Sequence, residues 1–202
     1  MLTKIFYFWS KFFKKIRGSS ILNSQIHKTS KIEAGSTIVN CSIGKYSSSG
    51  YDCKFVNTDI GSFCSIASNV CIGDSMHPID WVSTSSVFYD VNDSIKKKFS
   101  KHAFSDVKRT IIGSDVWIGQ NVLVKQGVVI GTGSIVGMGS VVTKDIPPYS
   151  IFGGNPARLI RYRFPVETID KLLETTWWEL DDDKIVSLAV DFNSPEELIK
   201  KI

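Results

Sequence analysis

The feature that most constrains this chain is a six-residue repeat that is strictest just after its midpoint. Between Ile111 and Ile146 an aliphatic residue recurs at every sixth position, and glycine follows most of these residues. The repeated positions are Ile112, Ile118, Val124, Ile130, Val136 and Val142, with glycine at Gly113, Gly119, Gly131 and Gly137. This period is neither the 3.6 of a helix nor the 2.0 of an ordinary strand. Fixed self-similarity at this length is typical of a parallel β-helix.

Three six-residue units are expected to form one triangular coil. The aliphatic residue of each unit points inward, and the small residue after it lets the chain turn the corner. Residues eighteen apart, such as Ile112 and Ile130 or Ile118 and Val136, should therefore stack about 4.8 Å from each other. The predicted fold class is an all-β solenoid.

The repeat also sets the expected organisation of the chain. It begins weakly after residue 20, becomes irregular around residues 47–52, and stops at Gly73. It returns at Ile112 and ends near Pro147. We therefore predict an N-terminal helix over residues 1–20, a solenoid over 21–162 with an excursion loop at 74–110, and a helical tail over 163–202.

The excursion loop is the first candidate for a functional segment, because long insertions in repeat arrays lie on one face, often the binding face. It carries two of the three histidines, His77 and His102. It also contains five aromatic residues that could form a wall over a ligand: Trp81, Phe88, Tyr89, Phe99 and Phe104. The third histidine, His27, is expected on an exposed side of an early coil.

The N-terminal segment 2–17 combines apolar residues at helical spacing with a basic flank. Lysines interrupt the apolar run and no cleavage site follows, so it predicts neither a secretory signal nor a bilayer span. One interpretation is a helix that packs against the solenoid or a neighbouring subunit and caps an open end. The other is an interfacial helix that lies on anionic lipid.

Composition narrows the class of protein. The net charge of +4 comes from the N-terminus, where residues 1–32 hold seven Lys or Arg and no acidic residue. Since no basic stripe follows, nucleic-acid binding is not expected. The four cysteines show no C-x-x-C spacing, so no metal site is predicted. Reduced thiols packed as small hydrophobes would suit a cytoplasmic protein.

The C-terminal tail is predicted to form three helices. Residues 165–178 and 181–190 show amphipathic patterns, and Ser194 to Glu197 forms a capping box with proline at the first helical position. Trp177 and Trp178 are expected to cover apolar surface where the tail folds back.

Five sequence motifs occur in a specific order along the chain. They are residues 60–66 (IGSFCSI), 76–78 (MHP), 112–119 (IGSDVWIG), 140–147 (SVVTKDIP) and 154–158 (GNPAR). In these motifs and their order, the chain resembles the hexapeptide acyltransferases over roughly residues 26–178. The resemblance is greatest to the branch of xenobiotic and sugar O-acetyltransferases. The resemblance implies a left-handed parallel β-helix, a homotrimer, and acetyl-CoA bound as cosubstrate in the groove between two solenoids.

The resemblance also implies roles for individual residues. A neutral imidazole can accept a hydroxyl proton at pH 7, and His77 matches the loop histidine that serves as general base. Its alternative is a structural role at the loop entrance. A backbone N–H near Gly119 and Gln120 would stabilise the oxyanion. The other expected cofactor residues are Trp117 near the pantetheine arm, Gly137 and Met138 at close backbone approach, and Thr143, Lys144 and Arg158 at the phosphates.

The expected activity is acetyl transfer to a hydroxyl of a sugar, in a surface polysaccharide or its lipid-linked precursor at the inner membrane face. Alternatives are an antibiotic O-acetyltransferase for streptogramin or chloramphenicol, and an N-acetyltransferase for nucleotide-linked amino sugars. A non-catalytic scaffold is a further alternative, which the loop histidine and the basic residues disfavour. A metal-dependent lyase is disfavoured by the scattered placement of His27, His77 and His102.

Overall fold

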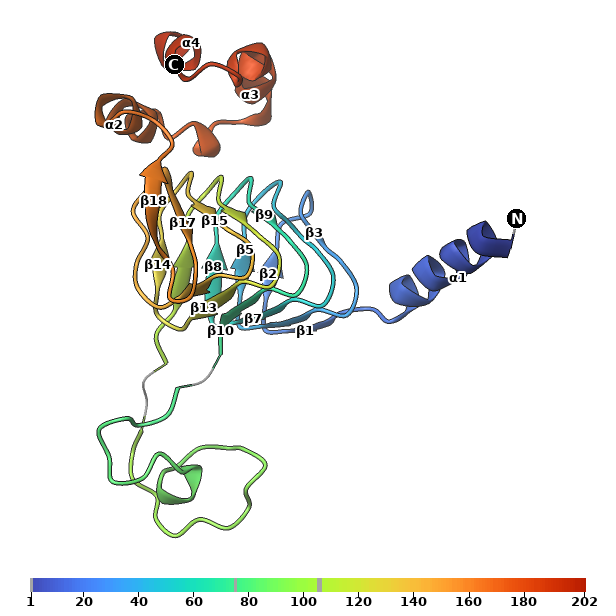
Figure 1. The fold of residues 1–202 in the computed structure, drawn as a ribbon, viewed down its shortest axis with the longest axis vertical. Helices are drawn as coiled ribbons and strands as arrows, with labels where there is room; N and C mark the ends of the chain where they lie inside the picture. The colour runs from blue at the N-terminus through green and yellow to red at the C-terminus, as the bar shows by residue number, and fades with distance from the viewer. Residues whose placement is uncertain (1, 75, 105–106) are drawn as a thin grey trace.

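The computed structural model of the chain describes residues 2–74, 76–104 and 107–202. Residue 1 of the predicted N-terminal helix and residues 75, 105 and 106 of the predicted excursion loop lie outside the described residues. The described part confirms the predicted solenoid: short parallel strands stack into three sheets around a triangular prism, with a helix at the N-terminus and helices at the C-terminus (Figure 1).

The three sheets are named A, B and C in the order in which the chain visits them. Sheet A contains β1 (Ser20–Leu22), β4 (Thr37–Val39), β7 (Lys54–Val56), β10 (Cys71–Gly73), β13 (Leu123–Lys125) and β16 (Val141–Val142). Sheet B contains β2 (Gln25–Ile26), β5 (Ser42–Ile43), β8 (Thr58–Ile60), β11 (Thr110–Ile112) and β14 (Val129–Ile130). Sheet C contains β3 (Lys31–Ile32), β6 (Ser48–Ser49), β9 (Ser65–Ile66), β12 (Trp117–Ile118), β15 (Ile135–Val136), β17 (Ser150–Gly153) and β18 (Arg158–Tyr162). Only β18 pairs antiparallel among these strands, with β17.

The repeated aliphatic residues form the core of the prism. The predicted stacking in the second half is confirmed, because Ile112 pairs with Ile130 and Ile118 with Val136 in parallel register. All four side chains are at most 1% exposed. The cysteines are free thiols, buried in three cases, and burial raises the pKa of Cys64 to about 11. They pack as small apolar residues, as expected.

The first coils are one residue shorter than those of the second half. Ile26 pairs with Ile43 and Ile38 with Phe55, so the repeat is seventeen residues here and eighteen in the second half, because Ile43 follows Ile38 after only five residues. The shorter corner between sheets A and B is turned by one asparagine in the left-handed region, for example Asn40 with φ 53°. Asparagine tolerates this conformation better than most residues.

The irregular pattern around residues 47–52 hides a regular coil. Ser49 takes the inward position between Ile32 and Ile66 in sheet C, with its side chain buried. The hydrophobic pattern is interrupted there because a small polar residue replaces an aliphatic one, while the backbone ladder continues.

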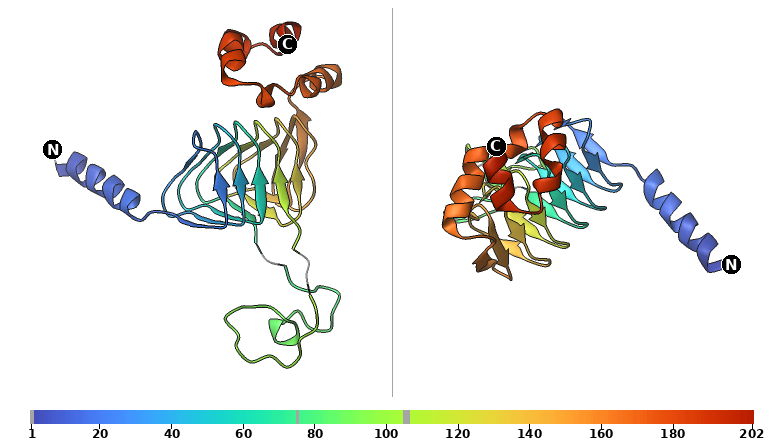
Figure 2. Two further views of the ribbon diagram at one scale, coloured as in Figure 1. Left: turned by 180° about the vertical axis from the view of Figure 1, so that it is seen from behind. Right: turned by 90° about the horizontal axis from the view of Figure 1, so that it is seen from above.

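The excursion loop leaves the solenoid at the corner between sheets A and B, here called the A–B corner. It runs from residue 74 to residue 109, since Thr110 already belongs to β11 and not to the loop. The loop contains one 3-10 turn, η1 (Ser86–Phe88), and extends away from the prism (Figure 1; Figure 2).

The tail forms the three expected helices, α2 (Val166–Thr175), α3 (Asp182–Leu188) and α4 (Pro195–Lys201). Two 3-10 turns, η2 (Trp177–Glu179) and η3 (Ala189–Asp191), separate them and shorten the predicted helical ranges. The Ser194 side chain caps α4 by accepting from the Glu197 N–H at 3.4 Å. Trp177 covers apolar surface as expected, with its ring 5.1 Å from that of Phe63 in the solenoid.

The N-terminal helix α1 (Leu2–Ile16) projects from the solenoid (Figure 2). Every residue from 3 to 17 is exposed, so the expectation that this helix packs against the solenoid of its own chain is wrong. Among the described residues, no helix has the length and hydropathy needed to cross a membrane.

Candidate active site

His77 lies at the beginning of the excursion loop, exposed to solvent. Its Nδ1 is 2.8 Å from the backbone oxygen of Thr84 and 3.0 Å from the hydroxyl oxygen of Tyr89. The Tyr89 ring is buried and stands edge-on to the imidazole. The loop therefore holds the imidazole by one of its two ring nitrogens.

This arrangement selects a tautomer. A carbonyl oxygen only accepts hydrogen bonds, so Nδ1 carries the hydrogen when it bonds to Thr84. The lone pair is then on Nε2, which can accept a proton. This is the geometry that a general base requires.

A cavity of about 290 Å³ opens beside His77, between the loop and the A–B corner. Its lining comes from the loop and from two separate coils: Val56, Asn57, Asp74, Met76, His77, Tyr89, Val91, Asp93, Phe104, Val107 and Gln126. A hydrogen bond from Ser86, with a further one from Lys98, lowers the pKa of Asp93 to about 2, so the cavity wall carries a carboxylate. The volume is near the lower end of the range for small-molecule sites.

The aromatic wall predicted for the loop is only partly formed. Tyr89 and Phe104 line the cavity, with ring centroids 5.1 Å apart. Trp81 packs edge-on against both of them and lies outside the lining. Phe88 and Phe99 pair with each other, and Trp81 and Phe88 line a separate loop cavity of about 230 Å³, so the five residues do not form one wall.

The competing loop histidine, His102, does not line this cavity. Its backbone pairs with Tyr89 in an isolated bridge, and its ring stands edge-on to Trp81 with centroids 5.8 Å apart. His102 therefore supports the loop segment that carries Tyr89. His27 is far along the solenoid in the coil of β2 and β3, where it contacts Thr29.

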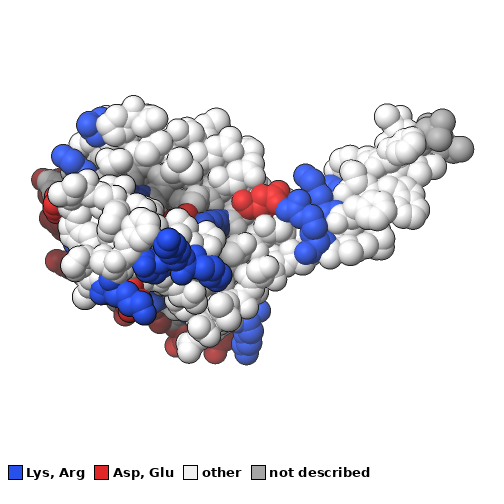
Figure 3. All heavy atoms as spheres, turned by 90° about the horizontal axis from the view of Figure 1, so that it is seen from below, with Lys and Arg blue, Asp and Glu red and all other residues white. Residues whose placement is uncertain are grey.

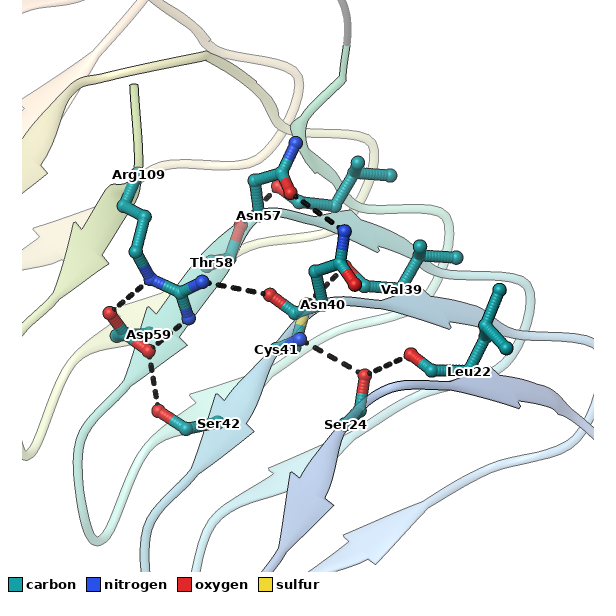
Figure 4. A network of polar contacts seen from close by, with 11 residues as sticks. Leu22, Ser24, Val39, Asn40, Cys41, Ser42, Asn57, Thr58, Asp59 and Arg109 are labelled. Carbon is teal, nitrogen blue, oxygen red and sulfur yellow. Dashed lines mark hydrogen bonds and ion pairs between the residues drawn. The ribbon is translucent and has the colours of Figure 1, made fainter. Parts of the chain in front are cut away.

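The C-terminal foot of the loop is fastened to sheet B by Arg109 (Figure 4). Its Nε donates to Asp59 Oδ2 at 2.6 Å, its Nη2 bonds to Asp59 Oδ1, and its Nη1 donates to the Asn40 backbone oxygen at 3.2 Å. The Ser42 hydroxyl donates to the same carboxylate at 2.5 Å. The Arg109 guanidinium lowers the pKa of Asp59 and so keeps it ionised.

The same network reaches the floor of the His77 cavity through Asn57. The Asn57 side chain accepts from Asn40 Nδ2 at 3.2 Å, and its backbone oxygen accepts from Thr110 N at 3.0 Å. Sequence reasoning missed Asn57 and Gln126 as lining residues. The available signal was the recurrence of asparagine every seventeen residues, at positions 23, 40 and 57.

Four of the expected cofactor residues meet at the corner between sheets C and A, here called the C–A corner. Gly139 N donates to the Gln120 oxygen at 2.8 Å, and a Cβ on Gly119 would lie 2.5 Å from Met138 N. Only glycine therefore fits at position 119 beneath the segment of Gly137 and Met138. The Gly119 N–H donates to Val136 O at 2.8 Å, so this amide belongs to the coil ladder.

Two further expected residues lie near this corner and two lie elsewhere. Trp117 is 55% exposed on β12, and Arg158 is exposed at the start of β18. Thr143 and Lys144 follow β16 at the A–B corner instead. Within one chain, the expected cofactor residues thus form two groups at the opposite ends of the strands of sheet A. Among the described residues, no cluster of three or more His, Cys, Asp or Glu could hold a metal.

Comparison with known proteins identifies relatives of this fold. The family model for the bacterial transferase hexapeptide (six repeats) matches residues 109–144. A probable macrolide acetyltransferase of Lysinibacillus sphaericus is 38% identical over 146 residues, covering 69% of this chain and 80% of that protein. A chloramphenicol acetyltransferase of Escherichia coli is 41% identical over 120 residues, covering 58% of this chain and 57% of that protein.

Among solved structures, AntD, an N-acyltransferase from Bacillus cereus in complex with dTDP and 3-hydroxybutyryl-CoA, has the same fold. Its TM-score is 0.54 at 21% identity, with 83% of this chain and 96% of that chain covered. The chain belongs to the hexapeptide-repeat acetyltransferases, as the sequence motifs predicted. It spans 57% and 60% of the length of the first two chloramphenicol acetyltransferases that it matches.

Proposed function

We propose that this protein is an acetyl-CoA-dependent O-acetyltransferase with His77 as general base. The observation that carries the proposal is the contact of Nδ1 with the Thr84 carbonyl, which leaves Nε2 as the proton acceptor beside a cavity. Relatives named as acetyltransferases support the reaction class.

Acetyl-CoA supplies an activated thioester, so the protein's task is to prepare the nucleophile and stabilise the developing charge. His77 Nε2 takes the proton of the acceptor hydroxyl as its oxygen bonds to the carbonyl carbon. The protonated ring then returns this proton to the sulfur as the C–S bond breaks. Because the Gly119 amide is occupied, we assign the oxyanion contact to the Gln120 N–H.

The division of the cofactor residues favours a site between two subunits of a homotrimer. In this arrangement Trp117 packs along the pantetheine arm, and the backbone of Gly137 and Met138 approaches it closely. Lys144 and Arg158 are exposed cations suited to phosphate oxygens, and Thr143 adds a hydroxyl beside Lys144. The two corners of one chain would each serve a different site in the ring.

We propose a sugar hydroxyl as the acceptor, in a surface polysaccharide or its lipid-linked precursor at the cytoplasmic side of the inner membrane. The loop sequence from His77 to Thr84, which resembles the sugar-acetylating members, supports this choice. A second candidate is an antibiotic hydroxyl, which the chloramphenicol and macrolide acetyltransferases among the relatives favour.

The experiment that tests the reaction follows release of free CoA from acetyl-CoA with a panel of glycans, nucleotide-linked amino sugars, chloramphenicol, a macrolide and a streptogramin. We expect turnover with a glycan. Turnover only with a drug would replace the sugar assignment, and turnover only with an amino sugar would replace O-transfer by N-transfer. If the protein shows neither turnover nor acetyl-CoA binding, it is a non-catalytic scaffold.

The role of His77 is tested by His77→Ala, which we expect to lower turnover by about 10² to 10⁴ while acetyl-CoA affinity stays unchanged. His27→Ala is the control, since that ring contacts Thr29 in the coil of β2 and β3 and does not line the cavity. A loss of less than tenfold in His77→Ala would show that the base lies elsewhere.

A further inference from the structure

The helix α1 exposes an unusually large apolar surface. Its bulky side chains are between 46% and 70% exposed: Ile5, Phe6, Tyr7, Phe8, Trp9, Phe12, Phe13 and Ile16. Several rings contact one another, with Trp9 stacked on Phe13 at 5.7 Å. Apolar residues in this density are normally covered in a soluble protein.

Four apolar residues of α1 form a stripe on a different face from three of its lysines, while Tyr7 lies beside Lys11, whose Nζ is 4.9 Å from the centre of the Tyr7 ring. Ile5, Trp9, Phe12 and Ile16 recur at spacings of three and four, which places them along one side of a helix. Lys4, Lys11 and Lys15 recur on another side by the same rule. The helix thus has an apolar stripe flanked by cations and contains no acidic residue.

The C-terminal end of α1 is attached to the first coils by two contacts. Arg17 forms an ion pair with Asp52, and Lys14 Nζ lies 5.5 Å from the centre of the Tyr51 ring. These contacts direct the rest of the helix away from the solenoid. Figure 3 shows α1 reaching out from the body, with pale surface along its outer part and cations gathered where it joins the coil.

We propose that α1 lies in the headgroup region of a bilayer that contains anionic phospholipids, with the apolar stripe of Ile5, Trp9, Phe12 and Ile16 inserted together with the Phe13 ring that stacks on Trp9. A helix of fifteen residues extends over only about 22 Å and cannot span the hydrocarbon core. An amphipathic helix with lysines on its polar face and tryptophan and phenylalanine on the other is the form that binds in the interface plane.

Charge favours lipid over a second copy of the chain as the occupant. Copies of α1 that packed together would bring their lysines near one another, and the helix offers no carboxylate to pair with them. An anionic leaflet supplies that complementary charge. The lipid contact itself is independent of the reaction. Its consequence, delivery of the His77 loop to a lipid-linked acceptor, rests on the proposed function.

The test is flotation of the full chain with vesicles of phosphatidylcholine and phosphatidylglycerol. We expect the triple aromatic variant, with Trp9→Ala, Phe12→Ala and Phe13→Ala, to bind the vesicles at least tenfold less than the wild type. Alanine preserves helix propensity while it removes the inserted rings. The triple variant with Lys4→Gln, Lys11→Gln and Lys15→Gln should also bind these vesicles at least tenfold less. The wild type should bind well to vesicles that contain phosphatidylglycerol and poorly to vesicles of phosphatidylcholine alone.

Thr3→Ala, Ser10→Ala is the matched control and should float like the wild type, since both side chains are small and polar. Equal flotation of the wild type and the triple aromatic variant would overturn the proposal. A second pair of results would also overturn it: the wild type does not bind vesicles, and the triple aromatic variant sediments as a smaller assembly than the wild type. In that case a neighbouring subunit covers the stripe. Acetyl transfer to a soluble acceptor should be the same in all variants, which separates this test from that of the proposed function.

Discussion

Two buried serines show how single hydroxyls affect the mainly apolar interior of the prism. Ser47 donates to the Gly61 oxygen at 2.7 Å and accepts from Cys64 N at 2.9 Å, which links adjacent coils. Ser49, two residues later, is 3% exposed and its hydroxyl has no hydrogen-bond partner among the described residues. A buried polar group without a partner costs free energy, whereas one with both partners stabilises the fold.

We therefore expect opposite effects from the same change at these positions. Ser49→Ala should raise the free energy of unfolding by about 1 kcal/mol, because an unsatisfied hydroxyl is removed. Ser47→Ala should lower it by roughly 1–3 kcal/mol, because the Cys64 N–H and the Gly61 carbonyl lose their shared partner. Urea unfolding at constant m-value measures both changes in the free energy of unfolding. Changes of the same sign would contradict the conclusion that the Ser47 hydroxyl has hydrogen-bond partners and the Ser49 hydroxyl has none.

At the scale of elements, the loop that carries His77 depends on the solenoid beneath it. Arg109 spans two coils at the foot of the loop, and Asn57 joins this clamp to the cavity floor. Both partners of the ion pair are partly exposed, so its effect is expected on loop position more than on global stability.

Arg109→Ala should speed proteolysis within residues 74–109 several-fold while the unfolding midpoint changes little, because only the foot of the loop is released. Lys200→Ala, which breaks an exposed ion pair on α4, is the control and should leave loop proteolysis unchanged. Arg109 lowers the pKa of Asp59 below its ordinary value of about 4. The ion pair of Arg109 with Asp59 should therefore hold above about pH 4 and weaken as the pH falls through the lowered pKa of Asp59. Unchanged loop proteolysis in Arg109→Ala would show that the clamp does not restrain the loop.

At the scale of the whole molecule, the separation of the two corners has a consequence for assembly. His77 and Lys144 lie at the A–B corner, whereas Gln120 and Met138 lie at the C–A corner. Under the proposed function a complete site requires two chains, so we expect the sedimenting species to have about three times the chain mass of 22.5 kDa.

Complementation tests this directly. His77→Ala should be almost inactive alone, and so should a protein with Trp117→Ala and Arg158→Ala. Co-expression of the two should give activity above that of either, because some interfaces combine an intact His77 with an intact cofactor corner. No recovery in verified mixed assemblies would place the site within one chain.

The sequence by itself determined the elements whose pattern is local. The six-residue period located the strands of the second half, the interruption after Gly73 located the loop, and Ser194 marked the start of α4. Each of these signals depends on residues close together in the chain, where side-chain size and turn preference act directly.

Only the tertiary structure decided the features that join distant segments. The cavity brings Asn57 and Gln126 to His77. The contacts of Arg17 with Asp52 and of Lys14 with Tyr51 direct α1 away from the prism. The physical reason is the same in each case: these arrangements are set by contacts between coils, loop and helix, which no short period in the sequence encodes.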